Sequence, residues 1–323
     1  MQGFQRIRRG LLLSAVLATA PLAAQAAWPD QPIRLIVPYA AGGGADNVAR
    51  VIAGPLGEKL GQSIIIENRP GAGATIAEGV VARSAPDGYT VLYDTFTYAV
   101  NASLRKLNFN PAKDLTPVAI TATAPLILVV NPKVPANNLA EFVTLAKDPN
   151  NKVTYASYGI GSAAHLAAEL LAREAKLTML HIPYKGGAPA LVDLVGGQVN
   201  AYFANASSGL PYVRNGTLRA LAVSSTKRLN TLPDVPTVAE SGYPGFDVLE
   251  WHGVFVPTGT PPEVAKKLAD AVQAVISSPD VVKRLNSLGI EPSPIPPSGA
   301  KAYIDDQVQR WSTLIKDRNI ALE

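Results

Sequence analysis

The amino-acid sequence predicts an α/β fold of two lobes that enclose a cleft. Apolar segments of strand length alternate with amphipathic segments of helical length, first from Ile33–Pro38 onward and again from Pro125–Pro132 onward. This alternation is typical of mainly parallel sheets covered by helices. The Pro-containing stretch 229–237 predicts a passage back from the second lobe. The first lobe is therefore expected to comprise residues 27–124 and 233–323, and the second lobe residues 125–232.

The individual elements follow from the spacing of apolar residues. After strand Ile33–Pro38, apolar residues recur every four positions from Val48 to Leu60, which predicts a helix that Gly61 ends. The strands 63–67 and 89–93 complete this part. Pro262 begins a helix predicted over 262–277, because proline suits the first helical position. The other predicted elements are helices at 139–147, 162–175, 188–195, 279–288 and 298–317, and strands at 153–157, 178–183, 199–204, 218–224 and 253–257.

Two loops rich in glycine lie where a predicted strand passes into a predicted helix. The first glycine loop is Tyr39–Asp46, and the second is Tyr158–Ser162. At such a junction, free backbone N–H groups and the positive end of the helix dipole point at one place, so they can bind an anion without Arg or Lys. Carboxyl ends of parallel strands share one edge of a sheet. The two loops together predict a site for a small carboxylate.

The first 26 residues have the pattern of a secretory signal peptide. Arg6, Arg8 and Arg9 precede an apolar run at 11–20, and the small residues of Ala24-Gln25-Ala26 fit signal peptidase cleavage before Ala27. The apolar run is short for a membrane span. The pair Arg8-Arg9 leaves twin-arginine export as an alternative. Either route predicts a periplasmic protein.

Composition excludes several classes of function. Without residues 1–26, the chain has 297 residues, and the loss of three arginines lowers its formal charge from +4 to +1. Lysines and arginines are scattered among acids, so no nucleic-acid partner is expected. With no cysteine, the sequence offers no disulfide, no thiolate metal site and no lipid-anchored residue. We expect a monomer without metal or cofactor.

Several short motifs resemble those of one family, the Bug proteins, which are the substrate-binding proteins of tripartite tricarboxylate transporters. They cover the whole mature chain in order, at residues 37–46, 67–73, 85–89, 159–166, 183–186 and 234–242. The resemblance implies a type II-like periplasmic binding protein with a ligand cleft between its lobes. Such a protein closes on a small organic acid and delivers it to inner-membrane transporter subunits.

The resemblance also implies which residues contact the ligand. In the family, one carboxylate is held largely by backbone N–H groups and ordered water. Ala204 stands where the family commonly has Asp, which argues against a ligand with an ammonium group. The aromatic residues Phe96, Tyr98 and Tyr202 would suit a ring, so the ligand is expected to be a mono- or dicarboxylate, phthalate-type acids included. The implied contacts are Tyr39, Gly42, Gly43, Gly44, Asp46, Thr95, Phe96, Gly161, Ser162, His165 and Asn205.

Some of these residues also have a purely structural interpretation. Asp46 is well placed to cap a helix, and His165 could simply be a capped or solvated side chain. Lys185 is interpreted as a solvated surface lysine. Trp251 and His252 are interpreted as packing at the junction of the lobes.

The alternatives to a transport receptor are an enzyme and a periplasmic sensor. Gly159-x-Gly161-x-x-Ala164 resembles a dinucleotide-binding fingerprint, but the next strand, 178–183, supplies no acid for a ribose. The sequence also contains neither a Gly-x-Ser-x-Gly nor a His-Glu-x-x-His motif, so no enzyme is predicted. A periplasmic sensor that presents the bound carboxylate to a signalling receptor would use the same cleft. For a transport receptor and for a sensor alike, the two lobes are expected to close about crossings near 122–128 and 228–238.

Overall fold

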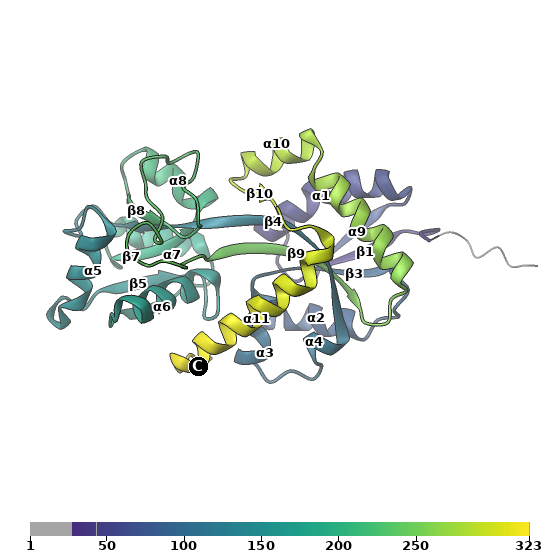
Figure 1. Ribbon diagram of the computed structural model, residues 1–323, viewed down its shortest axis with the longest axis horizontal. Helices are drawn as coiled ribbons and strands as arrows, with labels where there is room; N and C mark the ends of the chain where they lie inside the picture. The colour runs from purple at the N-terminus through teal and green to yellow at the C-terminus, as the bar shows by residue number, and fades with distance from the viewer. Residues whose placement is uncertain (1–27, 43, 323) are drawn as a thin grey trace, which may run out of the picture.

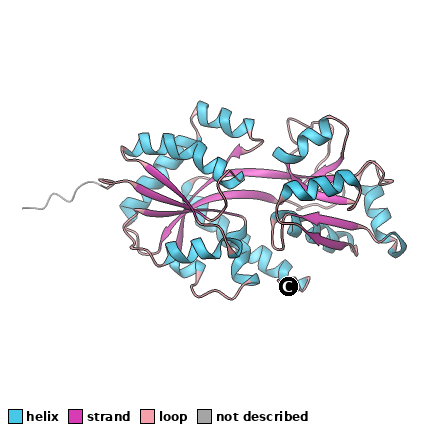
Figure 2. Ribbon diagram, turned by 180° about the vertical axis from the view of Figure 1, so that it is seen from behind, coloured by secondary structure: helices cyan, strands magenta, loops and turns pink. Residues whose placement is uncertain are grey.

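The computed structural model describes residues 28–42 and 44–322 and shows two lobes joined by two long strands (Figure 1). The predicted signal peptide and Gly43 lie outside the described residues. Figure 2 shows helices on both faces of the sheet in each lobe. The predicted two-lobed α/β fold is confirmed. Among the described residues, no helix combines the length and apolar character needed to cross a membrane.

The elements alternate as the sequence predicts. The first lobe begins with β1 (Ile33–Val37), α1 (Gly44–Leu60), β2 (Ile64–Asn68), η1 (Ala72–Ala74), α2 (Thr75–Ala82), β3 (Thr90–Thr95), α3 (Thr97–Leu104) and α4 (Pro111–Asp114). The chain then enters the second lobe through β4 (Leu115–Val130). That lobe contains α5 (Leu139–Lys147), η2 (Pro149–Asn151), β5 (Thr154–Ser157), α6 (Ala163–Ala175), β6 (Leu180–Pro183), α7 (Gly187–Gly196), β7 (Ala201–Asn205), α8 (Ala206–Arg214) and β8 (Arg219–Val223).

The chain returns to the first lobe through β9 (Leu249–Pro257). The remaining elements are α9 (Pro262–Ile276), α10 (Pro279–Ser287), β10 (Glu291–Pro292), η3 (Pro297–Gly299) and α11 (Ala300–Asp317). The three helices predicted in this part of the sequence are confirmed to within two residues at each end.

A single mixed sheet continues through both lobes. Its strand order is β2-β1-β3-β9-β4-β7-β5-β6, and β8 and β10 also pair with β4. Strands that are linked through helices are parallel, as β1 is to β2 and β3, and β5 is to β6 and β7. Every pairing of the crossing strands β4 and β9 is antiparallel, both with each other and with β3, β7, β8 and β10. The expectation of mainly parallel sheets therefore holds for the outer strands of each lobe and is wrong wherever β4 or β9 takes part.

The switch between lobes on β4 falls at Pro125/Leu126. Residues up to Pro125 pair with β9, whereas Leu126 onward pairs with β7. This position lies inside the predicted crossing at 122–128. The second predicted crossing, 228–238, is wrong: Thr237 bridges to Val223 of β8, so this segment lies within the second lobe. The return passage is the start of β9, directly after Val248 bonds to Ser224.

Two apolar cores position these elements. On one face of the first lobe's sheet, α1, α9 and α10 pack over a core that contains Val48, Ile52 and Leu56, which confirms the predicted apolar face of α1. The opposite face is covered by α2, α3 and α11, and its core continues into the second lobe. Strand β1 supplies both cores, Ile36 to one and Leu35 to the other, as the period of two requires.

Candidate functional site

The first glycine loop, between β1 and α1, is fastened by the carboxylate of Asp46. Gly42, at φ +79°, donates its N–H to Asp46 Oδ2 at 2.8 Å. Asn68 Nδ2 donates to Oδ1 at 2.9 Å, and Arg50 Nε donates to Oδ2 at 2.7 Å. Burial raises the pKa of Asp46, but the hydrogen bonds from Arg50, Gly42 and Asn68 outweigh it and keep the pKa below its usual value. The carboxylate is therefore occupied by protein donors, which favours its structural role over a ligand contact.

The second glycine loop, between β5 and α6, is fastened by the imidazole of His165. Gly161, also at φ +79°, donates its N–H to His165 Nδ1 at 3.1 Å. Ser162 caps α6, because its hydroxyl accepts the N–H of His165 at 3.3 Å. The same hydroxyl donates to Gly159 O at 2.6 Å. Gly161, Ser162 and His165 are thus brought together by the first turn of α6, as the sequence predicts.

His165 lies in an aromatic stack inside the second lobe. Its ring is 3.9 Å from that of His181, and His181 is 4.9 Å from the ring of Tyr155. Burial, with a smaller effect of His181, lowers the pKa of His165 to about 3. A neutral His165 can accept the Gly161 N–H, which a doubly protonated ring could not do. The structure therefore uses His165 to hold the loop.

A polar cluster lies between the two loops. We define the inter-lobe polar cluster as Tyr39, Asp94, Thr95, Tyr158 and Glu250. The Tyr39 hydroxyl of the first loop donates to Asp94 Oδ1 at 2.9 Å and lies 2.7 Å from Thr95 Oγ1. The Tyr158 hydroxyl of the second loop donates to Glu250 Oε2 at 2.6 Å. The Thr95 side chain lies close enough to Glu250 to lower the pKa of that carboxyl, so the cluster connects the two loops.

Burial leaves the carboxyls of this cluster easily protonated. It raises the pKa of Glu250 to about 7 and that of Asp94 to about 6. Burial and the nearby Asp94 also raise the pKa of Glu78 of α2 well above its usual value. Glu78 Oε2 and Asp94 Oδ2 are both buried without a hydrogen-bond partner among the described residues.

The two lobes touch at the second glycine loop. A Cβ placed on Gly161 would lie 2.4 Å from Leu104 Cδ1 of α3, so the end of that leucine side chain would have to move, and the positive φ of Gly161 also favours glycine. Gly42, in contrast, is exposed, and a Cβ there would have no heavy atom within 4 Å. We call this arrangement of the lobes closed, because the second loop touches the first lobe: Gly161 and Ser162 are buried, whereas Gly42 and Gly44 are exposed.

The other predicted site residues are placed as follows. Thr95 ends β3 and belongs to the cluster, and Gly44 is the first residue of α1. Asn205 ends β7, and its Oδ1 is buried without a hydrogen-bond partner among the described residues, which suits a ligand contact. The ring of Phe96 is buried 5.0 Å from that of Trp311 of α11. The Phe96 side chain is therefore not among the proposed ligand contacts.

The remaining aromatic residues divide between core and cluster. Tyr98 is buried against Phe255 and donates to Pro111 O at 3.0 Å, so it does not serve a ligand ring. Burial raises the pKa of Tyr202, and the nearby Glu250 carboxylate raises it further. Trp251 and His252 are buried at the junction of the lobes, as the sequence interpretation holds.

Sequence reasoning missed three residues of the cluster: Asp94, Tyr158 as a side chain, and Glu250. The acids stand inside apolar strands, which is the one signal that could have marked them, since unpaired acids are rarely buried. Among the described residues, no group of three or more His, Cys, Asp and Glu side chains is arranged to hold a metal ion.

Two α/β lobes that each bring a glycine loop to a shared polar cluster define a solute-binding protein. The family model described as "Tripartite tricarboxylate transporter family receptor" matches residues 48–320. The protein BugT of Bordetella pertussis is 36% identical over 317 residues, which are 97% of each chain. A relative from Pseudomonas sp. strain P51, named for the tcbD-tcbE intergenic region, is 35% identical over 97% of this chain and 94% of its own. The chain belongs to the tripartite tricarboxylate transporter receptor family.

Solved structures are similar over nearly the same length. The periplasmic binding protein BugD has a TM-score of 0.77 at 36% identity, covering 91% of this chain and 100% of its own. Rpa4515 of R. palustris, solved with adipate, has a TM-score of 0.80 at 34% identity, covering 91% and 100%. MatC from Rhodopseudomonas palustris, solved with bound malate, has a TM-score of 0.76 at 35% identity, covering 89% and 99%.

Proposed function

We propose that this protein captures a small organic carboxylate in the periplasm and delivers it to the membrane subunits of a tripartite tricarboxylate-type transporter. The observation that carries the proposal is the pair of glycine loops at β1–α1 and β5–α6, which meet the inter-lobe polar cluster from opposite lobes. Backbone N–H groups at helix N-termini suit a carboxylate as a class. The similar structures that hold adipate and malate support the same class of ligand.

The proposed ligand contacts are backbone groups of the two glycine loops, with side chains from the cluster and Asn205. The N–H groups of Gly42, Gly161 and Ser162 are not among them in this arrangement, because they already bond to Asp46, His165 and Gly159. The Tyr39 and Tyr158 hydroxyls can both donate and accept, so they can hydrogen-bond a carboxylate or a ligand hydroxyl. We expect ligand release to separate the Tyr158–Glu250 contact as the lobes open about Pro125/Leu126 and the start of β9. The strand pairings favour domain limits of 28–125 with 249–322, and 126–248.

The proposal is tested by thermal-shift screening of the protein without residues 1–26. Adipate and malate are the first compounds, followed by other aliphatic dicarboxylates, monocarboxylates and phthalate-type acids. A compound at 100 times its Kd stabilises the folded state by about 2.7 kcal/mol, which gives a clear rise in melting temperature. The protein is expected to return each ligand chemically unchanged and to remain a monomer. A screen without any concentration-dependent shift, or recovery of an altered ligand, contradicts the proposal.

A sensor that presents the carboxylate to a signalling receptor would use the same cleft. A deletion strain separates the two: transport predicts loss of uptake of the identified acid, whereas sensing predicts normal uptake with loss of induction of the genes for its use.

A further inference from the structure

The C-terminal helix α11 extends from the first lobe to the second. It packs against α3 and β4, where Trp311 lies against Phe96, and its far end reaches α6 (Figure 1). Helix α6 is the element whose first turn carries His165 and caps the second glycine loop. The end of the described chain is therefore in contact with the helix that supports a proposed ligand loop.

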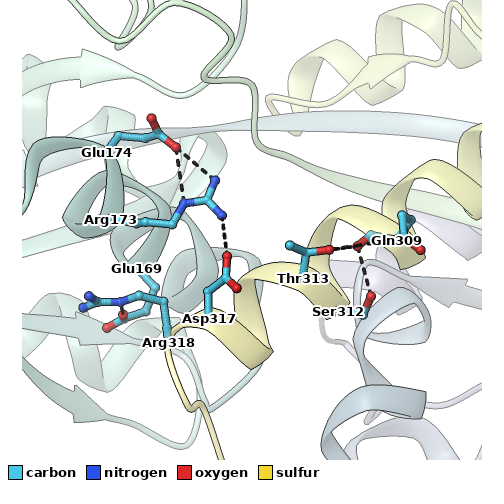
Figure 3. A network of polar contacts seen from close by, with 8 residues as sticks. All are labelled: Glu169, Arg173, Glu174, Gln309, Ser312, Thr313, Asp317 and Arg318. Carbon is cyan, nitrogen blue, oxygen red and sulfur yellow. Dashed lines mark hydrogen bonds and ion pairs between the residues drawn. The ribbon is translucent and has the colours of Figure 1, made fainter.

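An ion pair joins the two elements directly after α11 ends. Arg318 Nε lies 2.6 Å from Glu169 Oε2 of α6 (Figure 3). The Glu169 side chain is 12% exposed and that of Arg318 is 31% exposed, so water screens this pair less than a surface pair. The neighbouring pair of Arg173 and Asp317 is longer, at 3.4 Å, and more exposed.

From Glu169, a continuous set of contacts leads into the second glycine loop. Glu169 Oε1 accepts the Tyr155 hydroxyl at 2.5 Å. The Tyr155 ring stacks on His181 at 4.9 Å, and His181 stacks on His165 at 3.9 Å. His165 in turn accepts the N–H of Gly161 at 3.1 Å. Each contact is between buried or half-buried groups, so a change at Glu169 alters the packing of the ring that holds Gly161.

We propose that Arg318 is a positioning residue for the second glycine loop, and that its ion pair with Glu169 favours the closed arrangement of the lobes. The inference rests on the proposed function, because it assigns this pair to ligand capture. Glu169 bonds to Arg318 and to the Tyr155 hydroxyl, and without Arg318 only the second of these two bonds is left. A buried carboxylate that has lost its cation is costly, so the groups around it are expected to shift. Because the pair joins α11 to α6, its loss also removes a contact between the lobes.

The test compares Arg318→Gln with two further variants. Arg318→Lys keeps the positive charge. Lys301→Met is the matched control, because Lys301 stands at the opposite end of α11 and pairs with Asp305 of the same helix, with side chains 68% and 58% exposed. Two quantities are measured: amide hydrogen exchange of residues 159–165 without ligand, and affinity for the acid found in the screen, with its dissociation rate.

In Arg318→Gln, we expect these amides to exchange faster by about tenfold and the ligand to bind about tenfold more weakly, through faster dissociation. Arg318→Lys should recover part of both effects, and Lys301→Met should match the wild type. A double-mutant cycle with Tyr155→Phe should show non-additive losses of affinity.

A different pattern overturns the inference. If Arg318→Gln lowers only the melting temperature, while loop exchange and affinity stay at wild-type values, the ion pair is merely structural. If the wild type binds no carboxylate, the proposed function fails, and amide hydrogen exchange alone decides whether Arg318 positions the loop. In that case, unchanged exchange of residues 159–165 in Arg318→Gln rejects the positioning role.

Discussion

The two glycine loops use the same backbone arrangement with different chemistry. In each loop, a glycine at φ +79° donates its N–H to a side chain four residues later, in the first turn of the following helix. The acceptor is the Asp46 carboxylate in the first loop and the neutral His165 imidazole in the second. Each of these two turns thus has an acceptor at the same position, supplied by a different residue type.

The difference lies in what surrounds each acceptor. Asp46 is held locally, by Arg50 and Asn68 of the same lobe, and its loop is exposed. His165 is held by stacking on His181, and its loop is buried against α3 of the other lobe. The first loop should therefore respond to changes in its own hydrogen bonds, and the second to changes in packing, protonation and lobe position.

The largest expected effect separates the two acceptors. Asp46→Ala removes a fully buried carboxylate that accepts from Gly42, Arg50 and Asn68. Hydrogen bonds to a charged group contribute about 1.5–3 kcal/mol, so we expect a loss of about 3 kcal/mol. His165→Phe keeps a ring in the stack and leaves one N–H unpaired, which should cost about 1–2 kcal/mol. Urea unfolding at pH 8 measures both. Equal losses would show that the two loops are held equally.

The two glycines should differ in ligand affinity. Gly161→Ala places a Cβ on Leu104 across the closed lobes, and overpacking costs about 1–3 kcal/mol, so affinity should fall by about 10- to 100-fold. In Gly42→Ala the new Cβ contacts no heavy atom, so only the positive φ is unfavourable, and we expect a loss of about 1 kcal/mol of stability. Titration calorimetry measures the affinities. Leu104→Ala added to Gly161→Ala should restore binding, and its failure to do so would remove the clash as the cause.

The pH dependence of stability should also separate the loops. The pKa of His165 is lowered to about 3 in the folded protein, whereas an unfolded histidine titrates near its usual value, about 6.5. The unfolded chain therefore binds the extra proton first, and stability falls as pH decreases from about 6.5 toward 3. At pH 5 this amounts to about 2 kcal/mol.

His165→Phe should consequently be less stable than the wild type at pH 8 and equal to it or more stable at pH 5. Denaturant unfolding of both proteins across this pH range gives the difference between their free energies of unfolding. Carboxyl groups with a raised pKa, such as Glu250, produce the opposite trend with pH in both proteins, and that trend cancels in the difference. A constant difference between pH 8 and pH 5 would mean that His165 is not buried in its neutral form.

The smallest expected effect concerns Lys185, an exposed lysine that follows Tyr184, whose N–H bonds to Ser157 just before the second loop. Lys185→Met should leave ligand affinity within about tenfold, because exposed charges contribute about 0–1 kcal/mol. If calorimetry instead shows that this variant has lost binding while Gly161→Ala retains it, a side-chain cation holds the carboxylate in place of the backbone.

The sequence was a good guide wherever a pattern was local. The apolar spacing from Val48 to Leu60 fixed α1, and Pro262 marked the start of α9. The helix predicted over 162–175 is α6, and Ser162 stands at its N-cap. Local spacing was a poor guide to the crossing strands, because β4 includes Pro117 and Pro125 and extends over 16 residues, a combination that does not look like one strand.

What the sequence by itself determined is the order of strands and helices and the two glycine loops, because apolar period, helix capping and positive φ depend on neighbouring residues. Only the tertiary structure decided that Tyr39, Asp94, Tyr158 and Glu250 meet, that Phe96 faces α11, and that Arg318 reaches Glu169. These contacts join residues that are far apart in the chain, and those of Tyr158 with Glu250 and of Arg318 with Glu169 also join the two lobes. They depend on strand register and on how the lobes close, and neither is encoded in the spacing of any single segment.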